Sequence, residues 1–152
     1  MVETIVRAQI PLPVPVVFSH ISMLENMNEY NSSVRKSARV GRTSDGFPIY
    51  TIDIDLGFRA FQGEYIVREW IVNQKIVASC KQKDFQFTDT YTFRPEGKGT
   101  FLEIADQTEL KGLLSMSEFL LGPIMKSHMH QNLNTLLKIL ERKYSEKWIR
   151  YS

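Results

Sequence analysis

Residues 85–110 read FQFTDTYTFRPEGKGTFLEIADQTEL, and the fold prediction for the whole chain starts from this segment. Apolar and polar residues alternate on both sides of a loop at residues 95–99, and a period of two is typical of half-buried β-strands. The loop contains a proline and two glycines, which favour a reversal of the chain. We therefore predict strands over residues 85–93 and 100–110 that pair as a hairpin.

The hairpin carries one acidic residue in the apolar face of each strand, Asp89 in the first and Asp106 in the second. If Phe93 pairs with Leu102 across the loop, the same register places Asp89 opposite Asp106. Two carboxyl groups facing each other among apolar side chains repel, and one is driven toward its neutral form. A neutral acid beside an ionised one suits acid/base chemistry on a bound ketone.

Other arrangements of the two acids stay open at this point. The register could differ by two residues, a bulge could reverse the faces, or both acids could lie at a wet rim. Arg59, Lys81 or a neighbouring arginine could also neutralise them.

Strand patterns continue on the N-terminal side of the hairpin, where alternation predicts strands over residues 3–10, 34–41, 50–56, 59–71 and 76–81. Pro11, Pro13 and Pro15 end the first of these strands, because proline cannot donate a hydrogen bond to a sheet. Pro15 suits the first turn of a short helix, and a second short helix is expected near residues 24–30.

The last third of the chain has a helical pattern, with apolar residues at steps of three and four: Met125, Met129, Leu133, Leu136, Leu137 and Leu140. This pattern predicts a long helix over residues 123–144, followed by a tail at 145–152. Gly122 and Pro123 are expected to interrupt the preceding segment, where Ser115 and Glu118 have the spacing of a capping box. Strands followed by one long helix indicate an α+β domain.

Three motifs in this order carry a family resemblance: Ile10-x-x-Pro13-x-x-x-Val17-Phe18-x-x-Ile21 with Asn26-x-x-x-Tyr30, then Tyr91-x-Phe93-x-Pro95-x-x-x-Gly99-Thr100-x-Leu102, and finally Leu136-x-x-x-Leu140-Glu141. Together they resemble the START and birch-pollen-allergen superfamily (SRPBCC), also described as polyketide cyclase/dehydrase and lipid-transport proteins. The resemblance covers nearly the whole chain and implies a single START-like ligand-binding domain over residues 1–152.

The resemblance implies the helix-grip fold, an α+β fold with two short helices after the first strand. In it, a curved antiparallel sheet of about six to seven strands wraps around a long C-terminal helix. The cavity between them would bind a hydrophobic small molecule that is lipid-, quinone-, sterol- or polyketide-like. One alternative is a polyketide cyclase or dehydratase that uses acid/base residues in the same cavity. Another is a protein–protein adaptor that uses the groove or the basic C-terminal tail.

An enclosed cavity with paired polar groups would favour the enzyme, and an enclosed cavity without them would favour a carrier. A filled, collapsed cavity beside an exposed apolar patch would favour the adaptor. The residues expected to line the cavity are Ile54, Arg59, Phe61, Tyr65, Phe87, Asp89, Tyr91, Ile104, Asp106, Met125, Met129 and Leu133, with Met116 near the same helix turns. Asp89 and Asp106 are the candidate catalytic residues. Arg59 with Tyr65 could hold a ligand carboxylate or enolate, or Arg59 could lie in water at the sheet edge. Gly63 suits a bulge or a close backbone approach that helps the sheet to curl.

Composition excludes several other classes of protein. Lys and Arg number 19 against 17 Asp and Glu, and a net charge of +2 is too small to predict a nucleic-acid partner. The single cysteine, Cys80, excludes an internal disulfide framework. His128 and His130 point to different sides of a helix and no metal motif is present, so neither a metal nor another cofactor is expected. No apolar run approaches the ~20 residues of a membrane span, so stable membrane insertion is not expected and a cytoplasmic location is.

Overall fold

The computed structural model describes residues 1–57, 59–112, 115 and 118–151. Within them, seven strands form one antiparallel sheet in the order β1-β7-β6-β5-β4-β3-β2. The strands are β1 (Val2–Ile10), β2 (Val34–Arg42), β3 (Pro48–Asp55), β4 (Ala60–Ile71), β5 (Lys75–Lys81), β6 (Phe85–Glu96) and β7 (Gly99–Leu110). The helices are α1 (Val14–Ile21), the 3-10 helix η1 (Leu24–Glu29), α2 (Glu118–Lys143) and α3 (Ser145–Tyr151). The predicted α+β helix-grip architecture is therefore confirmed, with seven strands.

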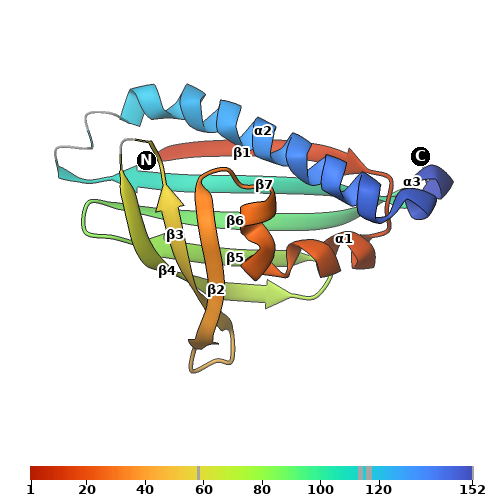
Figure 1. The fold of residues 1–152 in the computed structure, drawn as a ribbon, viewed down its shortest axis with the longest axis horizontal. Coiled ribbons are helices and arrows are strands. Elements are labelled where there is room, and N and C mark those ends of the chain that lie inside the picture. Colours follow the sequence, from red (N-terminus) through yellow and green to blue (C-terminus); the bar gives the residue numbers. More distant parts are fainter. Residues whose placement is uncertain (58, 113–114, 116–117, 152) are drawn as a thin grey trace.

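The sheet is strongly curved, and β2 and β3 run steeply across the direction of β5, β6 and β7 (Figure 1). Irregularities in pairing accompany this curvature: β2 has two against β3, and β4 has one at Arg68 against β5. Such bulges bend a strand and increase its twist. Gly63, by contrast, pairs regularly with Ile52, and a Cβ atom there would lie 2.6 Å from Gln82 Nε2. The expected bulge at Gly63 is therefore wrong, and the close approach is made by side chains and not by backbone as expected.

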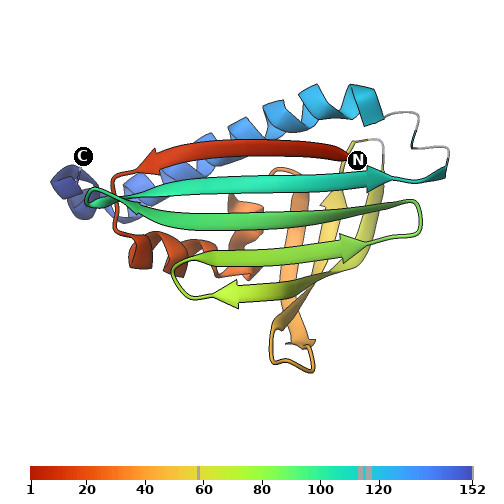
Figure 2. The ribbon, with the colours of Figure 1, turned by 180° about the vertical axis from the view of Figure 1, so that it is seen from behind.

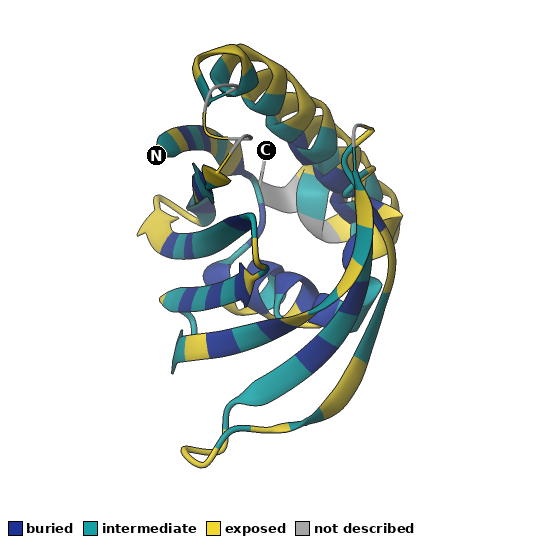
Figure 3. Cartoon of the chain, turned by 90° about the vertical axis from the view of Figure 1, so that its left-hand side faces the viewer, coloured by how far each residue is buried: buried dark blue, intermediate teal, exposed yellow. Residues whose placement is uncertain are grey.

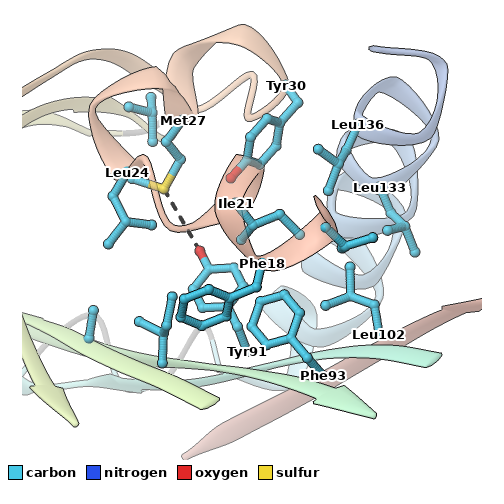
Figure 4. Packing of buried hydrophobic residues seen from close by; sticks show 14 of the residues in the cluster. Phe18, Ile21, Leu24, Met27, Tyr30, Tyr91, Phe93, Leu102, Leu133 and Leu136 are labelled. Carbon is cyan, nitrogen blue, oxygen red and sulfur yellow. Dashed lines mark hydrogen bonds between the residues drawn. The ribbon is translucent and has the colours of Figure 1, made fainter. Parts of the chain in front are cut away.

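The helices cover the concave face of the sheet (Figures 1 and 2). The view in Figure 3 shows buried bands alternating along the strands, as a sheet with one covered face requires. Phe18 and Ile21 of α1 pack toward Phe93 and Leu102 of the sheet (Figure 4). Among the described residues, no helix combines the length and the apolar character needed to cross a bilayer.

Helix α2 extends beyond the predicted bounds at its N-terminus. It begins at Glu118 and contains Pro123, whereas the sequence pattern predicted a start at residue 123. Proline removes one helical hydrogen bond, to the carbonyl four residues earlier. Here that carbonyl belongs to Phe119, which is largely exposed, in the first turn of the helix, where water can replace the missing bond. The predicted tail at 145–152 is helical over Ser145–Tyr151.

The capping box expected before α2 is wrong. Glu118 accepts hydrogen bonds from the Leu110 amide at 2.9 Å and from the Met1 amino group at 2.7 Å, while Ser115 donates to the Gly112 carbonyl. Glu118 therefore ties the start of α2 to the end of β7 instead of capping its own helix. Met116 lies outside the described residues.

The β6–β7 hairpin is longer than predicted, and its turn consists only of Gly97 and Lys98. Gly97 has a φ of 59°, a conformation that glycine adopts without steric cost. Beside this turn the end of β1 lies so close that a Cβ atom on Gly99 would overlap the Ile10 carbonyl oxygen. The buried Thr100 hydroxyl donates to the Leu12 carbonyl at 2.8 Å. Gly99 and Thr100 therefore hold the hairpin against the backbone at the end of β1 and just after it.

We expect Gly99→Ala to lower the free energy of unfolding by about 1–3 kcal/mol, because the new methyl group meets backbone that cannot rotate away. Urea unfolding followed by circular dichroism measures this change. The control is Gly41→Ala, where no atom lies within 4 Å of the added carbon and where we expect a change within about 0.5 kcal/mol. Equal effects at both positions would contradict the close approach.

Candidate functional site

A cavity of about 550 Å³ lies between the concave face of the sheet and α2, closed on a third side by η1 and the loop that follows it. Small-molecule sites commonly have volumes of about 300–1,000 Å³ and mostly apolar walls. Leu133 and Leu136 are buried where α2 packs down, whereas Leu120 and Ile124, nearer its N-terminus, line the cavity and are also more than half exposed. The cavity therefore opens beside the N-terminal half of α2.

Ten of the twelve residues expected at the cavity do line it: Ile54, Tyr65, Phe87, Asp89, Tyr91, Ile104, Asp106, Met125, Met129 and Leu133. They come from β3, β4, β6, β7 and α2. The side-chain periodicity of each strand and of the helix places them on the face toward the cavity. That these residues contact a ligand stays a prediction.

Arg59 and Phe61 do not line the cavity, so their expected places in its wall are wrong. Arg59 forms an ion pair with Asp84, and its guanidinium lies 5.5 Å from the centre of the Phe85 ring. Phe61 packs edge-on against Phe85 with ring centres 4.6 Å apart. Arg59 is therefore engaged outside the cavity and cannot hold a ligand anion there, nor does it lie free in water.

The predicted pairing of Asp89 with Asp106 is confirmed, because Phe93 pairs with Leu102 and the register continues unbroken. The Tyr65 hydroxyl donates to Asp89 Oδ2 at 2.6 Å. The Thr108 hydroxyl donates to Asp106 Oδ1 on the other side of the pair. Tyr65, Asp89, Asp106 and Thr108 thus form one polar strip, contributed by β4, β6 and β7, in a mostly apolar wall.

No lysine or arginine among the described residues lines the cavity, so no cationic side chain compensates this acid pair. Burial raises the pKa of Asp89 well above its usual range, and the Asp106 carboxylate and a hydrogen bond with it raise that pKa further. The hydrogen bond from Tyr65 acts in the opposite direction but is the smaller effect. The raised pKa means that Asp89 holds a proton more tightly than an exposed aspartate does, and neither Arg59 nor the exposed Lys81 neutralises it.

Three tyrosines surround the acid pair. The Tyr65 and Tyr91 hydroxyl oxygens lie 3.5 Å apart, and the Tyr91 hydroxyl points to Met27 Sδ at 3.8 Å (Figure 4). Burial raises the pKa of Tyr65 and of Tyr91 well above the usual range, and Asp89 adds to both shifts, so both hydroxyls stay protonated. The Tyr30 hydroxyl is buried with no hydrogen-bond partner among the described residues.

Hydrogen bonds at the cavity rim join α2 to the loop after η1. Asn132 Oδ1 accepts from the Ser32 amide at 3.2 Å, and Asn132 Nδ2 donates to Asn31 Oδ1 at 3.3 Å. Tyr30, Asn31 and Asn132 line the cavity but were not among the expected residues. Asn31 and Asn132 interrupt apolar patterns in the sequence, which is only a weak indication of a functional role. Their contact across the cavity rim is visible only in the folded structure.

Other candidate groups lie elsewhere or have ordinary roles. His128 lines the cavity and His130 does not, as their helical spacing predicts, although both are exposed. His20 is buried 6.2 Å from the Tyr144 ring, and burial lowers its pKa. Burial raises the pKa of the Cys80 thiol to about 11, which keeps it unreactive. The described residues contain no group of three or more metal-binding side chains.

Comparison with known proteins identifies the fold. No protein-family model matches the chain, and no curated protein matches its sequence. A solved structure from Thermus thermophilus superposes with a TM-score of 0.75 at 20% identity, covering 90% of this chain and 94% of that one. A START superfamily protein from Mycobacterium smegmatis gives 0.69 at 19% identity and covers 95% and 97%. The Zhui aromatase/cyclase from a Streptomyces species gives 0.73 at 9% identity and covers 93% and 94%. The chain thus has the fold that its motifs suggested.

The raised pKa of Asp89 makes the contribution of this residue to stability depend on pH. Because folding retains a proton that an unfolded aspartate releases, this contribution is largest below the unfolded pKa of about 3.9. It falls by about 1.4 kcal/mol per pH unit as the pH rises toward the folded pKa. Asparagine has nearly the shape of aspartate but cannot ionise. We therefore expect Asp89→Asn to have a higher free energy of unfolding than the unmodified protein at neutral pH.

Urea unfolding of both proteins at a series of pH values measures this difference, which we expect to widen from acid to neutral pH. Asp45→Asn, at an exposed turn position, is the control and should leave the pH dependence unchanged. If Asp89→Asn were less stable than the unmodified protein at neutral pH, Asp89 would instead be stabilising as a carboxylate.

Proposed function

We propose that this protein binds a hydrophobic small molecule in the cavity between its sheet and α2. The observation that carries the proposal is an open, mostly apolar cavity of about 550 Å³ that the protein's own side chains leave unfilled. Protein interiors are otherwise close-packed, so a void of this size is unusual in a core. Lipid-, quinone-, sterol- and polyketide-like molecules are the classes that the family resemblance suggests.

Apolar contact would supply most of the affinity, at roughly 25 cal/mol per Å² of buried apolar surface before the entropic costs of association. Apolar walls distinguish poorly between ligands of similar size, so the few polar groups would set specificity. Asp89, Asp106, Tyr65 and Tyr91 are the candidates, because they stand together on the cavity wall.

A second candidate function is acid/base conversion of the ligand, as in a polyketide cyclase or dehydratase. The acid pair favours it: a neutral Asp89 could protonate a ligand carbonyl while Asp106 accepts a proton. Incubation with a poly-β-ketone followed by mass spectrometry tests this function. A product that has lost water with the unmodified protein, but not with Asp89→Asn, would support it. The adaptor function receives less support, because the cavity is open rather than collapsed.

We expect the protein to bind Nile red, an uncharged apolar dye, and Met129→Trp to weaken that binding about tenfold or more by filling the cavity. His130→Trp is the control, because it adds the same side chain at an exposed position on the same helix. Fluorescence titration measures both affinities, and native mass spectrometry of freshly purified protein identifies any bound molecule. Equal Nile red binding by both variants would place the dye outside the cavity and contradict the proposal.

A further inference from the structure

We propose that the ligand of this cavity is a hydrophobic amine, whose protonated nitrogen binds at the Asp89 and Asp106 carboxyl groups. The inference rests on the proposed function and names the class of ligand for the same site. Its support comes from the hydrogen-bonding capacity of the wall, the charge of the wall, and one unpartnered hydroxyl group.

The hydroxyl groups that contact the acid pair directly already donate within the protein. Tyr65 donates to Asp89 and Thr108 donates to Asp106, while the Tyr91 hydroxyl points to Met27. A carboxylate has about four lone-pair sites, so the capacity left over at the pair is for accepting hydrogen bonds. An ammonium group supplies three donors and no acceptor, and therefore matches what the wall leaves open.

The charge of the wall favours a cation and disfavours an anion. The described lining contains Asp89 and Asp106 but no lysine or arginine, and His128 is its one basic side chain. The nearby Arg59 is held by Asp84 outside the cavity. A ligand carboxylate or phosphate would therefore lose its water without gaining a cationic partner, which is costly in an apolar site. A protonated amine would supply the counter-charge that the acid pair lacks.

The Tyr30 hydroxyl gives independent evidence that a polar ligand group belongs here. Tyr30 lines the cavity and is 9% exposed, and its hydroxyl has no partner among the described residues. Figure 4 shows this hydroxyl directed from the loop toward the sheet. Buried hydroxyls are rarely left without a hydrogen bond. A polar group on a ligand would supply the missing partner, either as a donor or as an acceptor, so Tyr30 indicates a polar ligand and the choice of an amine rests on the acid pair.

Aromatic rings in the wall suit the same ligand class. Tyr65, Phe87 and Tyr91 all line the cavity close to the acid pair in the sheet. The face of an aromatic ring attracts a cation, and this attraction strengthens when the site is desolvated. The surroundings of the carboxyl groups therefore favour an ammonium group over a neutral polar group of the same size.

The test compares four molecules of equal length that differ only in the polar end: dodecylamine, dodecanol, methyl decyl ketone and dodecanoate. Their affinities for the unmodified protein are measured by displacement of Nile red, below the concentration at which each forms micelles. We expect dodecylamine to bind about tenfold to a hundredfold more tightly than dodecanol, the ketone to bind no better than the alcohol, and dodecanoate to bind most weakly.

Variants then test which side chains cause the preference for the amine over the alcohol. The double variant Asp89→Asn with Asp106→Asn should lower the ratio of amine affinity to alcohol affinity about tenfold or more. Asp53→Asn, on β3 outside the cavity wall, should leave that ratio unchanged. Tyr30→Phe removes an unpaired hydroxyl and should fold at least as well as the unmodified protein, while lowering amine affinity about two- to tenfold.

The outcomes separate the two proposals. If Nile red and all four molecules fail to bind, the proposed function is wrong and this inference falls with it. If dodecanol or the ketone binds but dodecylamine binds no better, the protein binds hydrophobic molecules and only the assignment to amines is wrong. An amine preference that survives the double asparagine variant would also overturn the assignment, because the cation would then bind elsewhere.

Discussion

The acid pair and the apolar wall around it both follow from the pairing register of β6 on β7. A turn of two residues, Gly97 and Lys98, sets that register, and β6 and β7 stay in step along their full paired length. Side chains alternate between the two faces of a sheet, so a shift of one residue would turn one strand over relative to the other and place Asp89 and Asp106 on opposite faces. If β7 were the strand turned over, polar residues such as Gln107 would enter the apolar face. A different turn would therefore remove the site and disrupt the core at once.

The cavity itself exists because α2 is packed tightly at only one end. Leu133, Leu136 and Leu140 are buried against the sheet, whereas Leu120 and Ile124 stay exposed although they face the cavity. The curvature of the sheet moves β2 and β3 away from the line of α2, and the helix cannot contact both sides of a strongly curved sheet (Figure 1). Rim hydrogen bonds hold the helix over the opening instead of closing it.

Much of the fold could be predicted because it follows from short-range periodicity. Each predicted strand lies within a few residues of an observed one, and the opposition of Asp89 and Asp106 follows from alternation together with one turn. The start of α2 could not be predicted in the same way. Pro123 normally ends a helix, and it is tolerated here because its position in the helix leaves an exposed carbonyl unpaired. Contacts between distant segments explain the rest: Asp84, from the turn between β5 and β6, holds Arg59 outside the cavity, and Tyr30 enters it from a loop without a regular period.

An uncompensated acid pair in a core destabilises the folded state, and such groups persist mainly where they serve a function. Conversion of a ketone and binding of an amine would both depend on the acid pair having no cationic partner in the protein. The two functions need opposite protonation states of Asp89. A ketone accepts a hydrogen bond and so favours the pair while Asp89 keeps its proton. An ammonium group lowers the pKa of a neighbouring acid and so drives that proton into solvent. The protonation state of Asp89 in the complex therefore reveals which kind of ligand the cavity holds.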